Sequence, residues 1–203
     1  MRSRGVVARV PAKVNLQLSV GPLGSDGFHE VTTVFQAISL FDDVTVATAP
    51  EGDGIKISIT GQTSSGVPAD SSNLAVKAAE LMIKNYDLPA DLIIKLKKEI
   101  PVAGGMAGGS ADAAGVIVGL DSLFELGLSR DEMEIVGSKI GSDVPFSICG
   151  GVELVLVEVI KLRQHFLREV ITGYWHYLAK DYQHHRFIKS VIDYVKAYLS
   201  QHH

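Results

Sequence analysis

Alternation of apolar and polar positions dominates the first sixty residues of the chain. Five segments are rich in β-branched residues and alternate at least in part, which predicts strands at residues 4–10, 14–20, 31–40, 44–49 and 55–60. The first two flank Pro11-Ala12-Lys13, and the last two flank Pro50–Gly54, whose turn residues predict a hairpin. These sixty residues therefore predict a mainly antiparallel sheet.

Helical spacing of apolar residues begins after a polar loop over residues 61–72. In the stretch 74–86 the apolar residues fall on one face, and Ser72 or Asn73 can cap the helix. The remaining pattern predicts a strand at 92–96, a helix from about 113 to 124, a helix from the capping box Ser129–Glu132 to about Ile140, and a break at Gly141–Pro145. This order of strands and helices predicts an α+β fold.

Composition narrows the class of protein without pointing to one function. The 203 residues are 46% apolar and 21% charged, which is ordinary for a globular protein. A formal net charge of -4 gives no reason to expect nucleic acid or an acidic membrane as a partner. The single cysteine, Cys149, and the lack of a stretch of about 18 apolar residues favour a cytoplasmic location.

One sharp change of composition divides the chain near Gly151. Of the twenty glycines only Gly173 lies beyond this point, and all seven prolines lie before it, whereas six of the seven histidines lie after it. The change predicts one domain over residues 1–151 and a second region over 152–203. The second region is expected to begin with a strand at 152–160 and to continue as a helical tail, which would cover apolar surface or form a homodimer contact.

The glycine-rich stretch Ile100–Ala114 carries the candidate chemistry. Glycines lack Cβ atoms, so the backbone can take positive φ and approach a ligand closely; here they are Gly104, Gly105, Gly108 and Gly109. A predicted helix follows, and the free N–H groups of its first turn attract anions. The stretch therefore predicts a phosphate-binding loop, with a tight helix-packing turn as the alternative. It fits neither the P-loop nor the dinucleotide-binding pattern.

Four separated motifs agree with one protein family. They are Pro11–Leu16, Asp26–Glu30 with Thr33–Gln36, Pro101–Ala114, and Gly141–Phe146 with Gly150-Gly151. Over roughly residues 5–151 they resemble the GHMP small-molecule kinases, and among these the branch that acts on a cytidine diphosphate-linked methylerythritol in non-mevalonate isoprenoid synthesis. The resemblance implies the N-terminal domain of that family, which is ribosomal protein S5 domain 2-like. It also implies ATP-dependent phosphorylation of the substrate's 2-hydroxyl, with ATP and Mg²⁺ as cofactors.

The resemblance also implies which residues form the site. Asp143 would accept the proton of the acceptor hydroxyl, and Lys13 would hold Asp143 ionised and offset charge on the transferred group. Asn15, Phe28 and His29 match substrate-binding positions, with the histidine at the cytosine-bearing end. The ATP-binding positions are Asn73, Pro101, Val102, Ala103, Gly104, Gly105, Met106, Ala107, Gly108, Gly109, Ser110 and Ala111. No fixed metal site is expected, and Ser110 is the candidate for a contact with Mg²⁺.

The sequence departs from the family pattern at several positions. Phe28 stands where tyrosine is usual, which keeps a ring for stacking on a base but loses the hydroxyl. Ala103 replaces a glycine of the loop. Asp112, at the start of the predicted helix, is expected to interact with the helix dipole rather than with a metal. Beyond Gly151 nothing matches the second domain of the family, although the family's active site lies in a cleft between its two domains.

Three hypotheses for the function stay open. The first is the ATP-dependent kinase that the resemblance implies. The second is a catalytically silent, truncated or recombined relative that binds a nucleotide, and the third is a GHMP kinase for another small alcohol. The presence of both Lys13 and Asp143 favours the first, whereas the unmatched second half favours the second. A small molecule is the expected partner, rather than nucleic acid or a membrane.

Overall fold

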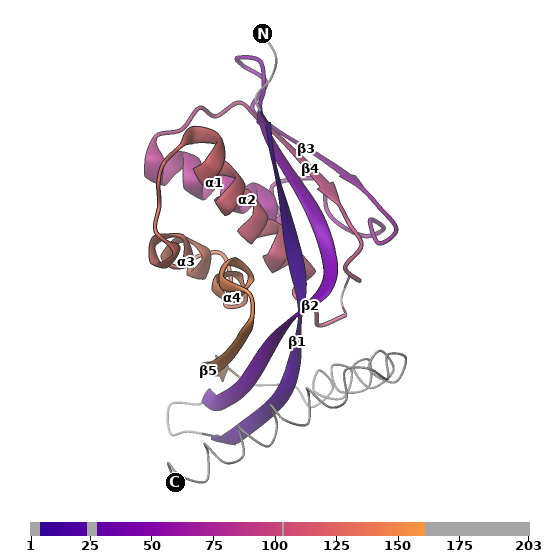
Figure 1. Ribbon diagram of the computed structural model, residues 1–203, viewed down its shortest axis with the longest axis vertical. Helices are drawn as coiled ribbons and strands as arrows, with labels where there is room; N and C mark the ends of the chain where they lie inside the picture. The colour runs from indigo at the N-terminus through magenta and orange to yellow at the C-terminus, as the bar shows by residue number, and fades with distance from the viewer. Residues whose placement is uncertain (1–4, 24–27, 103, 161–203) are drawn as a thin grey trace. The chain divides into compact units, whose positions relative to one another are not determined.

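The computed structural model describes residues 5–23, 28–102 and 104–160, and it describes the backbone alone for residues 20–23, 28–31 and 153–160. The elements are β1 (Gly5–Leu23), β2 (Phe28–Thr48), β3 (Ile55–Thr60), α1 (Leu74–Tyr86), β4 (Leu92–Lys97), α2 (Gly108–Phe124), α3 (Arg130–Ser138), α4 (Val144–Cys149) and β5 (Val152–Ile160) (Figure 1). The described residues divide into a larger unit, 5–13 with 37–151, and a smaller unit, 14–23 and 28–36 with 152–160. The mixture of strands and helices confirms the α+β content.

Two long strands replace the four short ones that the sequence predicts. The segments 4–10 and 14–20 both belong to β1, and the segments 31–40 and 44–49 both belong to β2. Pro11 does not interrupt β1, which lies at the edge of the strand order β1-β2-β4-β3, where proline is tolerated. The prediction of separate strands was therefore wrong.

The predicted hairpin between residues 44–49 and 55–60 was also wrong. Strand β4 lies between β2 and β3, antiparallel to β2 with Val44 opposite Leu96 and parallel to β3 with Ile57 opposite Ile94. A parallel pair needs a crossover connection, and the segment with α1 supplies it. Leu92, Ile94 and Leu96 of β4 are fully buried, so this strand takes the central position in place of a direct pair between β2 and β3.

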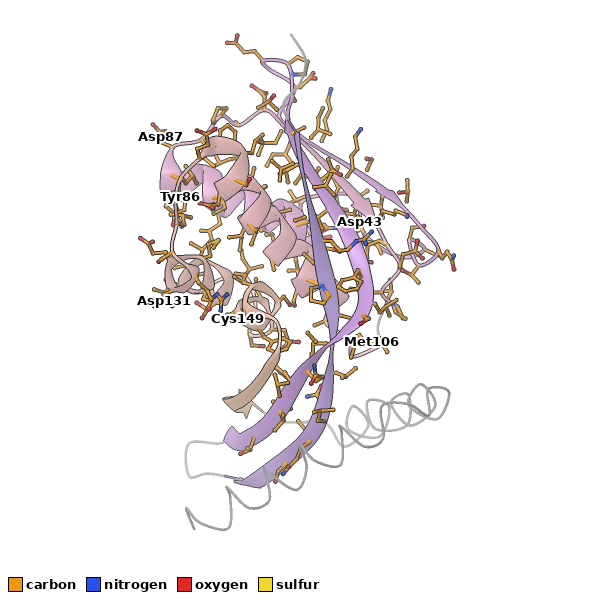
Figure 2. All side chains as sticks on the ribbon, viewed as in Figure 1. Asp43, Tyr86, Asp87, Met106, Asp131 and Cys149 are labelled. Carbon is orange, nitrogen blue, oxygen red and sulfur yellow. The ribbon has the colours of Figure 1, made fainter. Side chains whose placement is uncertain are left out.

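Helices α1 and α2 pack against each other and cover one face of the sheet in the larger unit (Figure 1). Ten of the seventeen residues of α2 are buried, which is typical of a helix in the centre of a core. Its glycines permit close contact with β2: a Cβ on Gly115 would lie 2.8 Å from Cγ2 of Val44, and a Cβ on Gly119 would lie 2.7 Å from Cγ2 of Val46. The side chain of Met106, in the glycine loop, is also part of this core (Figure 2).

The predicted helix caps are confirmed. Asn73 caps α1, since its side-chain oxygen accepts a hydrogen bond from the N–H of Ala75 at 2.9 Å. Ser129 and Glu132 form both bonds of the capping box at the start of α3. The predicted break after this helix is present, but a further short helix, α4, begins at Val144. Pro145 lies in its first turn, where proline is tolerated, so the sequence motif does not prevent a new helix.

In the smaller unit β2 pairs with β5, antiparallel, from Phe28 opposite Ile160 to Gln36 opposite Val152. This pairing confirms the strand predicted at residues 152–160. The predicted helical tail, with its proposed covering or dimerising role, lies outside the described residues. The division into domains 1–151 and 152–203 stays a prediction.

Candidate functional site

The glycine loop, residues 100–107, joins β4 to α2 and contains two residues in the left-handed backbone region. Gly105 and Ala107 have positive φ values of 68° and 57°. Ala107 occupies the N-cap position of α2 without a capping side chain, and the N–H of Ala111 makes a helical bond, to the carbonyl of Ala107 at 2.8 Å. The N–H groups just before Ala111 therefore lie in the first turn of α2, where a helix has free donors that can attract an anion.

A cavity of about 340 Å³ lies beside this loop in the larger unit. Asn73 at the start of α1 and the described loop residues Pro101–Val102 and Gly104–Gly109 line it, so the structure brings these predicted ATP-binding positions together. Val67, Pro68 and Leu74 add apolar surface. The volume falls within the range of small-molecule sites, and the combination of an apolar wall with a loop of backbone donors suits a nucleotide.

Three predicted ATP-binding residues differ from this lining set. Ala103 lies outside the described residues. Ser110 is half-buried in the first turn of α2, and Ala111 is fully buried against the core, so the side chain of Ala111 faces protein. In this part of α2, backbone N–H groups of the first turn, rather than the side chain of Ala111, would bind a phosphate.

Lys13 and Asp143 form an ion pair in the larger unit. Nζ of Lys13 lies 3.5 Å from Oδ2 of Asp143, which occupies the N-cap position of α4. Lys13 is buried, with 7% of its surface exposed, whereas the Asp143 side chain is 29% exposed. Burial lowers the pKa of Lys13, and the nearby Asp143 carboxylate opposes that shift. The backbone N–H of Lys13 donates to the carbonyl of Met106 at 3.1 Å, which attaches the pair to the glycine loop.

The predicted substrate-binding residues belong to the smaller unit. Asn15 donates a hydrogen bond from Nδ2 to Oγ1 of Thr33 at 2.7 Å, and this hydroxyl donates to the carbonyl of Gln17 at 2.8 Å. The side chain of Asn15, on β1, is thereby joined to Thr33 on β2. Phe28 and His29 lie on β2, and their side chains are outside the described part of the structure.

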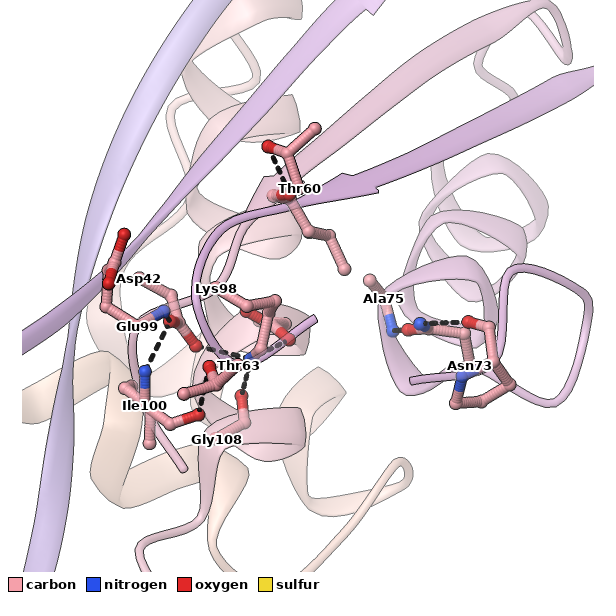
Figure 3. A network of polar contacts seen from close by, with 12 residues as sticks. Asp42, Thr60, Thr63, Asn73, Ala75, Lys98, Glu99, Ile100 and Gly108 are labelled. Carbon is pink, nitrogen blue, oxygen red and sulfur yellow. Dashed lines mark hydrogen bonds and ion pairs between the residues drawn. The ribbon is translucent and has the colours of Figure 1, made fainter. Parts of the chain in front are cut away.

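A buried cluster of Asp42, Lys98 and Asp112 lies at the base of the glycine loop (Figure 3). Nζ of Lys98 bonds to Oδ2 of Asp42 and lies 2.5 Å from Oδ2 of Asp112. At most 2% of each residue is exposed. Burial raises the pKa of Asp112 to about 7, although the Lys98 ammonium partly opposes the shift. Lys98 and Asp112 also contribute to the lining of the cavity.

The expectation that Asp112 interacts with the helix dipole was wrong. Asp112 lies beyond the first turn of α2, where its carboxylate pairs with Lys98 rather than with the helix end. The sequence held one signal for this pairing, because Asp112 is followed by Ala113 and Ala114 and preceded by Ala111 in a helix that buries most of its residues. A carboxylate in such a helix needs a cationic partner, but nothing local in the sequence points to Lys98.

Comparison with known proteins shows which family has this arrangement. Residues 73–151 match the family model described as GHMP kinases N terminal domain. This range runs from the Asn73 cap through the glycine loop to the end of the larger unit. The chain carries a GHMP kinase N-terminal domain.

Curated relatives extend the match over more of the chain than the GHMP kinase model covers. A 4-diphosphocytidyl-2-C-methyl-D-erythritol kinase of Mycolicibacterium smegmatis is 51% identical over 149 residues, which are 73% of this chain and 45% of the relative. The enzyme of that name from Rhodococcus jostii is 52% identical over 148 residues, covering 73% of this chain and 47% of its own length. The chain thus spans about half the length of these relatives.

A solved structure supports the same assignment of the GHMP kinase domain. The crystal structure of a 4-(cytidine 5'-diphospho)-2C-methyl-D-erythritol kinase superposes with a TM-score of 0.59 at 32% sequence identity. The match covers 75% of this chain and 52% of that enzyme. About half of that enzyme's chain therefore has no counterpart in the match.

A Mg²⁺ ion that accompanies a nucleotide would need few protein ligands in this domain. Among the residues that the structure describes, no three His, Cys, Asp or Glu side chains gather as a metal site. Mg²⁺ retains several waters and is commonly held through one or two protein groups and substrate phosphates. The half-buried Ser110 hydroxyl, in the first turn of α2 just after the loop, fits that kind of contact.

Among the residues that the structure describes, no helix has the length and apolar character needed to cross a bilayer.

Proposed function

We propose that this chain takes part in ATP-dependent phosphorylation of the 2-hydroxyl of 4-diphosphocytidyl-2-C-methyl-D-erythritol. The observation that carries the proposal is the Lys13–Asp143 ion pair, attached through Met106 to a glycine loop that borders a cavity of about 340 Å³. The relatives named 4-diphosphocytidyl-2-C-methyl-D-erythritol kinase, which are 51% and 52% identical over the matched residues, support the choice of substrate.

Each group at the site has a role in the proposed transfer. The carboxylate of Asp143 accepts the proton of the 2-hydroxyl while the 2-oxygen forms a bond to the γ-phosphorus of ATP. The bond from that phosphorus to the β,γ-bridging oxygen breaks, and ADP leaves. Lys13 holds Asp143 ionised and offsets charge on the transferred group. Because this transfer needs positioning and charge compensation above all, a carboxylate paired with a buried cation suits it.

The glycine loop binds the phosphates of ATP in this proposal. The N–H groups at the start of α2 hold phosphate oxygens, Asn73 lies at the adenine-bearing end of the cavity, and Ser110 contacts Mg²⁺, which compensates phosphate charge when bound. Asn15, Phe28 and His29 bind the acceptor, with the phenyl ring of Phe28 stacking on the cytosine. The cytoplasmic location expected from the sequence stays a prediction.

A coupled assay of ADP release tests the proposal. The full chain is incubated with ATP, Mg²⁺ and 4-diphosphocytidyl-2-C-methyl-D-erythritol, beside Asp143→Asn and a matched control, Asp131→Asn. Asp131 is an exposed carboxylate in the first turn of α3, so its loss should leave turnover unchanged (Figure 2). Substrate-dependent ADP release that disappears in Asp143→Asn alone is the expected result.

A second candidate function has its own observation in favour. The cavity lined by Asn73 and the glycine loop needs no catalytic residue in order to hold a nucleotide, so a nucleotide-binding protein without turnover is the alternative. Tight ATP binding with no ADP release in the assay above would establish that alternative and reject the kinase. Faster phosphorylation of a different small alcohol would instead indicate a GHMP kinase of other specificity.

A further inference from the structure

The entry to the glycine loop is fixed by one buried carboxylate. Oδ1 of Asp42 accepts hydrogen bonds from the backbone N–H groups of Glu99 at 2.6 Å and Ile100 at 2.9 Å (Figure 3). Asp42 belongs to β2 and is fully buried. The residues at the entry to the loop therefore have their N–H groups directed at a side chain of the sheet, and they cannot move away without leaving Oδ1 of a buried carboxylate without hydrogen-bond donors.

The exit from the loop is fixed by the cation of the same cluster. Nζ of Lys98 donates to the carbonyl of Gly108, the first residue of α2, at 3.4 Å, and to Asp112 one turn further along the helix. The two ends of the loop are also in close contact, because a Cβ on Gly108 would lie 3.1 Å from Cγ2 of Ile100. One ammonium group thus joins the sheet to the beginning of the helix that carries the anion-binding N–H groups.

A buried cluster of this composition is a poor way to stabilise a fold. With two carboxylates and one ammonium, the cluster lacks one positive charge. Burying these ions requires their removal from water, and apolar side chains of similar volume would avoid that cost in folding free energy. Asp112 illustrates the cost, since its Oδ1 atom is buried without a hydrogen-bond partner. What the cluster does supply is a fixed geometry, because each of its bonds has a defined direction.

We propose that Lys98 is a positioning residue that holds the glycine loop closed at its base, in the shape that binds the phosphates of a nucleotide. The inference rests on the proposed function for the identity of that nucleotide, ATP. With Lys98 in place, the loop meets its ligand already ordered, and binding loses less conformational entropy. Without it, the two ends of the loop are free to separate, and we expect the affinity for ATP to fall at least tenfold.

Variants of the cluster separate positioning from stability. In Lys98→Met with Asp112→Leu, two apolar side chains replace the ion pair, and Asp42 keeps the N–H donors of Glu99 and Ile100. A second double variant, Lys98→Met with Asp112→Asn, adds less volume. The single variant Asp112→Asn leaves Lys98 an acceptor of the same shape and should retain the affinity within about twofold, as a conservative rescue. Each protein is first characterised by urea unfolding.

The affinity of each folded variant for ATP with Mg²⁺ is then measured by calorimetric titration. A double variant that folds, although less stably than the natural chain because the buried Asp42 has lost its cation, and that binds ATP at least tenfold more weakly is the expected result. Equal affinity in a folded double variant overturns the proposal, and so does failure of both double variants to fold, since the cluster would then serve stability alone. Arg9→Met, which removes an exposed pair with Asp43, is the matched control and should change nothing.

The same titration distinguishes this inference from the proposed function. ATP binding by the natural chain without ADP release rejects the kinase reaction but leaves the role of Lys98 open to measurement. Turnover together with unaltered ATP affinity in a folded double variant rejects the role of Lys98 and leaves the kinase intact. Absence of ATP binding by the natural chain rejects both.

Discussion

Nζ of Lys13 lies 3.5 Å from Oδ2 of Asp143, although 130 residues separate them in the chain. Lys13 is buried and Asp143 is partly open to solvent, so the pair presents its carboxylate, rather than its ammonium, to an incoming molecule. This asymmetry suits a carboxylate that accepts a proton and a buried cation that keeps the carboxylate ionised.

Replacing Lys13 with methionine keeps the length of the side chain and removes the charge. We expect kcat of the proposed reaction to fall by about two orders of magnitude or more, because Asp143 loses its cationic partner and the transferred group loses charge compensation. Single-turnover kinetics with a bound nucleotide check this. A kcat within threefold of the natural chain would exclude a catalytic role for Lys13, provided that unfolding curves show a folded protein.

Replacing Gly115 with alanine should destabilise the larger unit. The new Cβ would lie 2.8 Å from Val44 and 3.0 Å from Val10, both buried, so that α2 has to move away from the sheet. Such overpacking costs roughly 1–3 kcal/mol of unfolding free energy. Urea unfolding measures the loss, and the double variant with Val44→Ala should recover part of it.

The matched control for this prediction is Gly141→Ala. Its added Cβ would meet only Cγ2 of Val144, at the ordinary contact distance of 3.7 Å. An equal loss of stability in both variants would mean that the close contact between α2 and β2 is not the cause.

Local features of the sequence predicted local structure well. They did not predict which strands pair or which side chains far apart in the chain make contact. The caps at Asn73 and Ser129 depend on residues two or three positions away, and both are present. The insertion of β4 between two strands that are adjacent in sequence depends on burial of its Leu and Ile residues, which no turn motif reveals.

In the candidate site, too, the sequence predicted the local feature but not the contacts between distant residues. The glycine loop was recognisable because its composition determines its own backbone conformation. Pairing of Lys98 with Asp42 joins residues 56 positions apart in the chain, and neither side chain has a neighbour in sequence that demands it. The contact between Lys13 and Asp143 was expected only because of the family resemblance, since a strand lysine and a helix-cap aspartate have no pattern in common.

Replacing Ala107 with glycine should stabilise the chain slightly. Ala107 has φ +57°, in the left-handed region, which costs a residue with a Cβ roughly 1–2 kcal/mol. Glycine removes this strain but gains entropy in the unfolded chain, so a net gain of about 0.5–1 kcal/mol in unfolding free energy is expected. Ala114→Gly, in the regular interior of α2, is the control and should lose about 1 kcal/mol or more. A loss of stability in both variants would contradict the expectation.

Asp112 should give the stability of the larger unit a distinctive dependence on pH. In the folded chain its pKa is raised to about 7 from an ordinary value of 3.8, mainly because burial disfavours the charged form. The folded state thus binds this proton more tightly than the unfolded state does. The resulting stabilisation of the folded state is fully present below about pH 4, and it is lost as the pH rises through 7.

Asp112→Asn removes this titration, so the difference in unfolding free energy between the variant and the natural chain isolates it from all other groups. Between pH 4 and pH 7.5 we expect the variant to gain relative stability by up to about 4 kcal/mol, from roughly 1.4 kcal/mol for each unit of pKa shift. Urea unfolding at four or five pH values over this range provides the measurement. Lys98 and Asp42, the charged groups that act on Asp112 in the described structure, are present in both proteins. A difference that stays constant with pH would show that Asp112 remains ionised throughout, and the Lys98 ammonium would then outweigh the effect of burial.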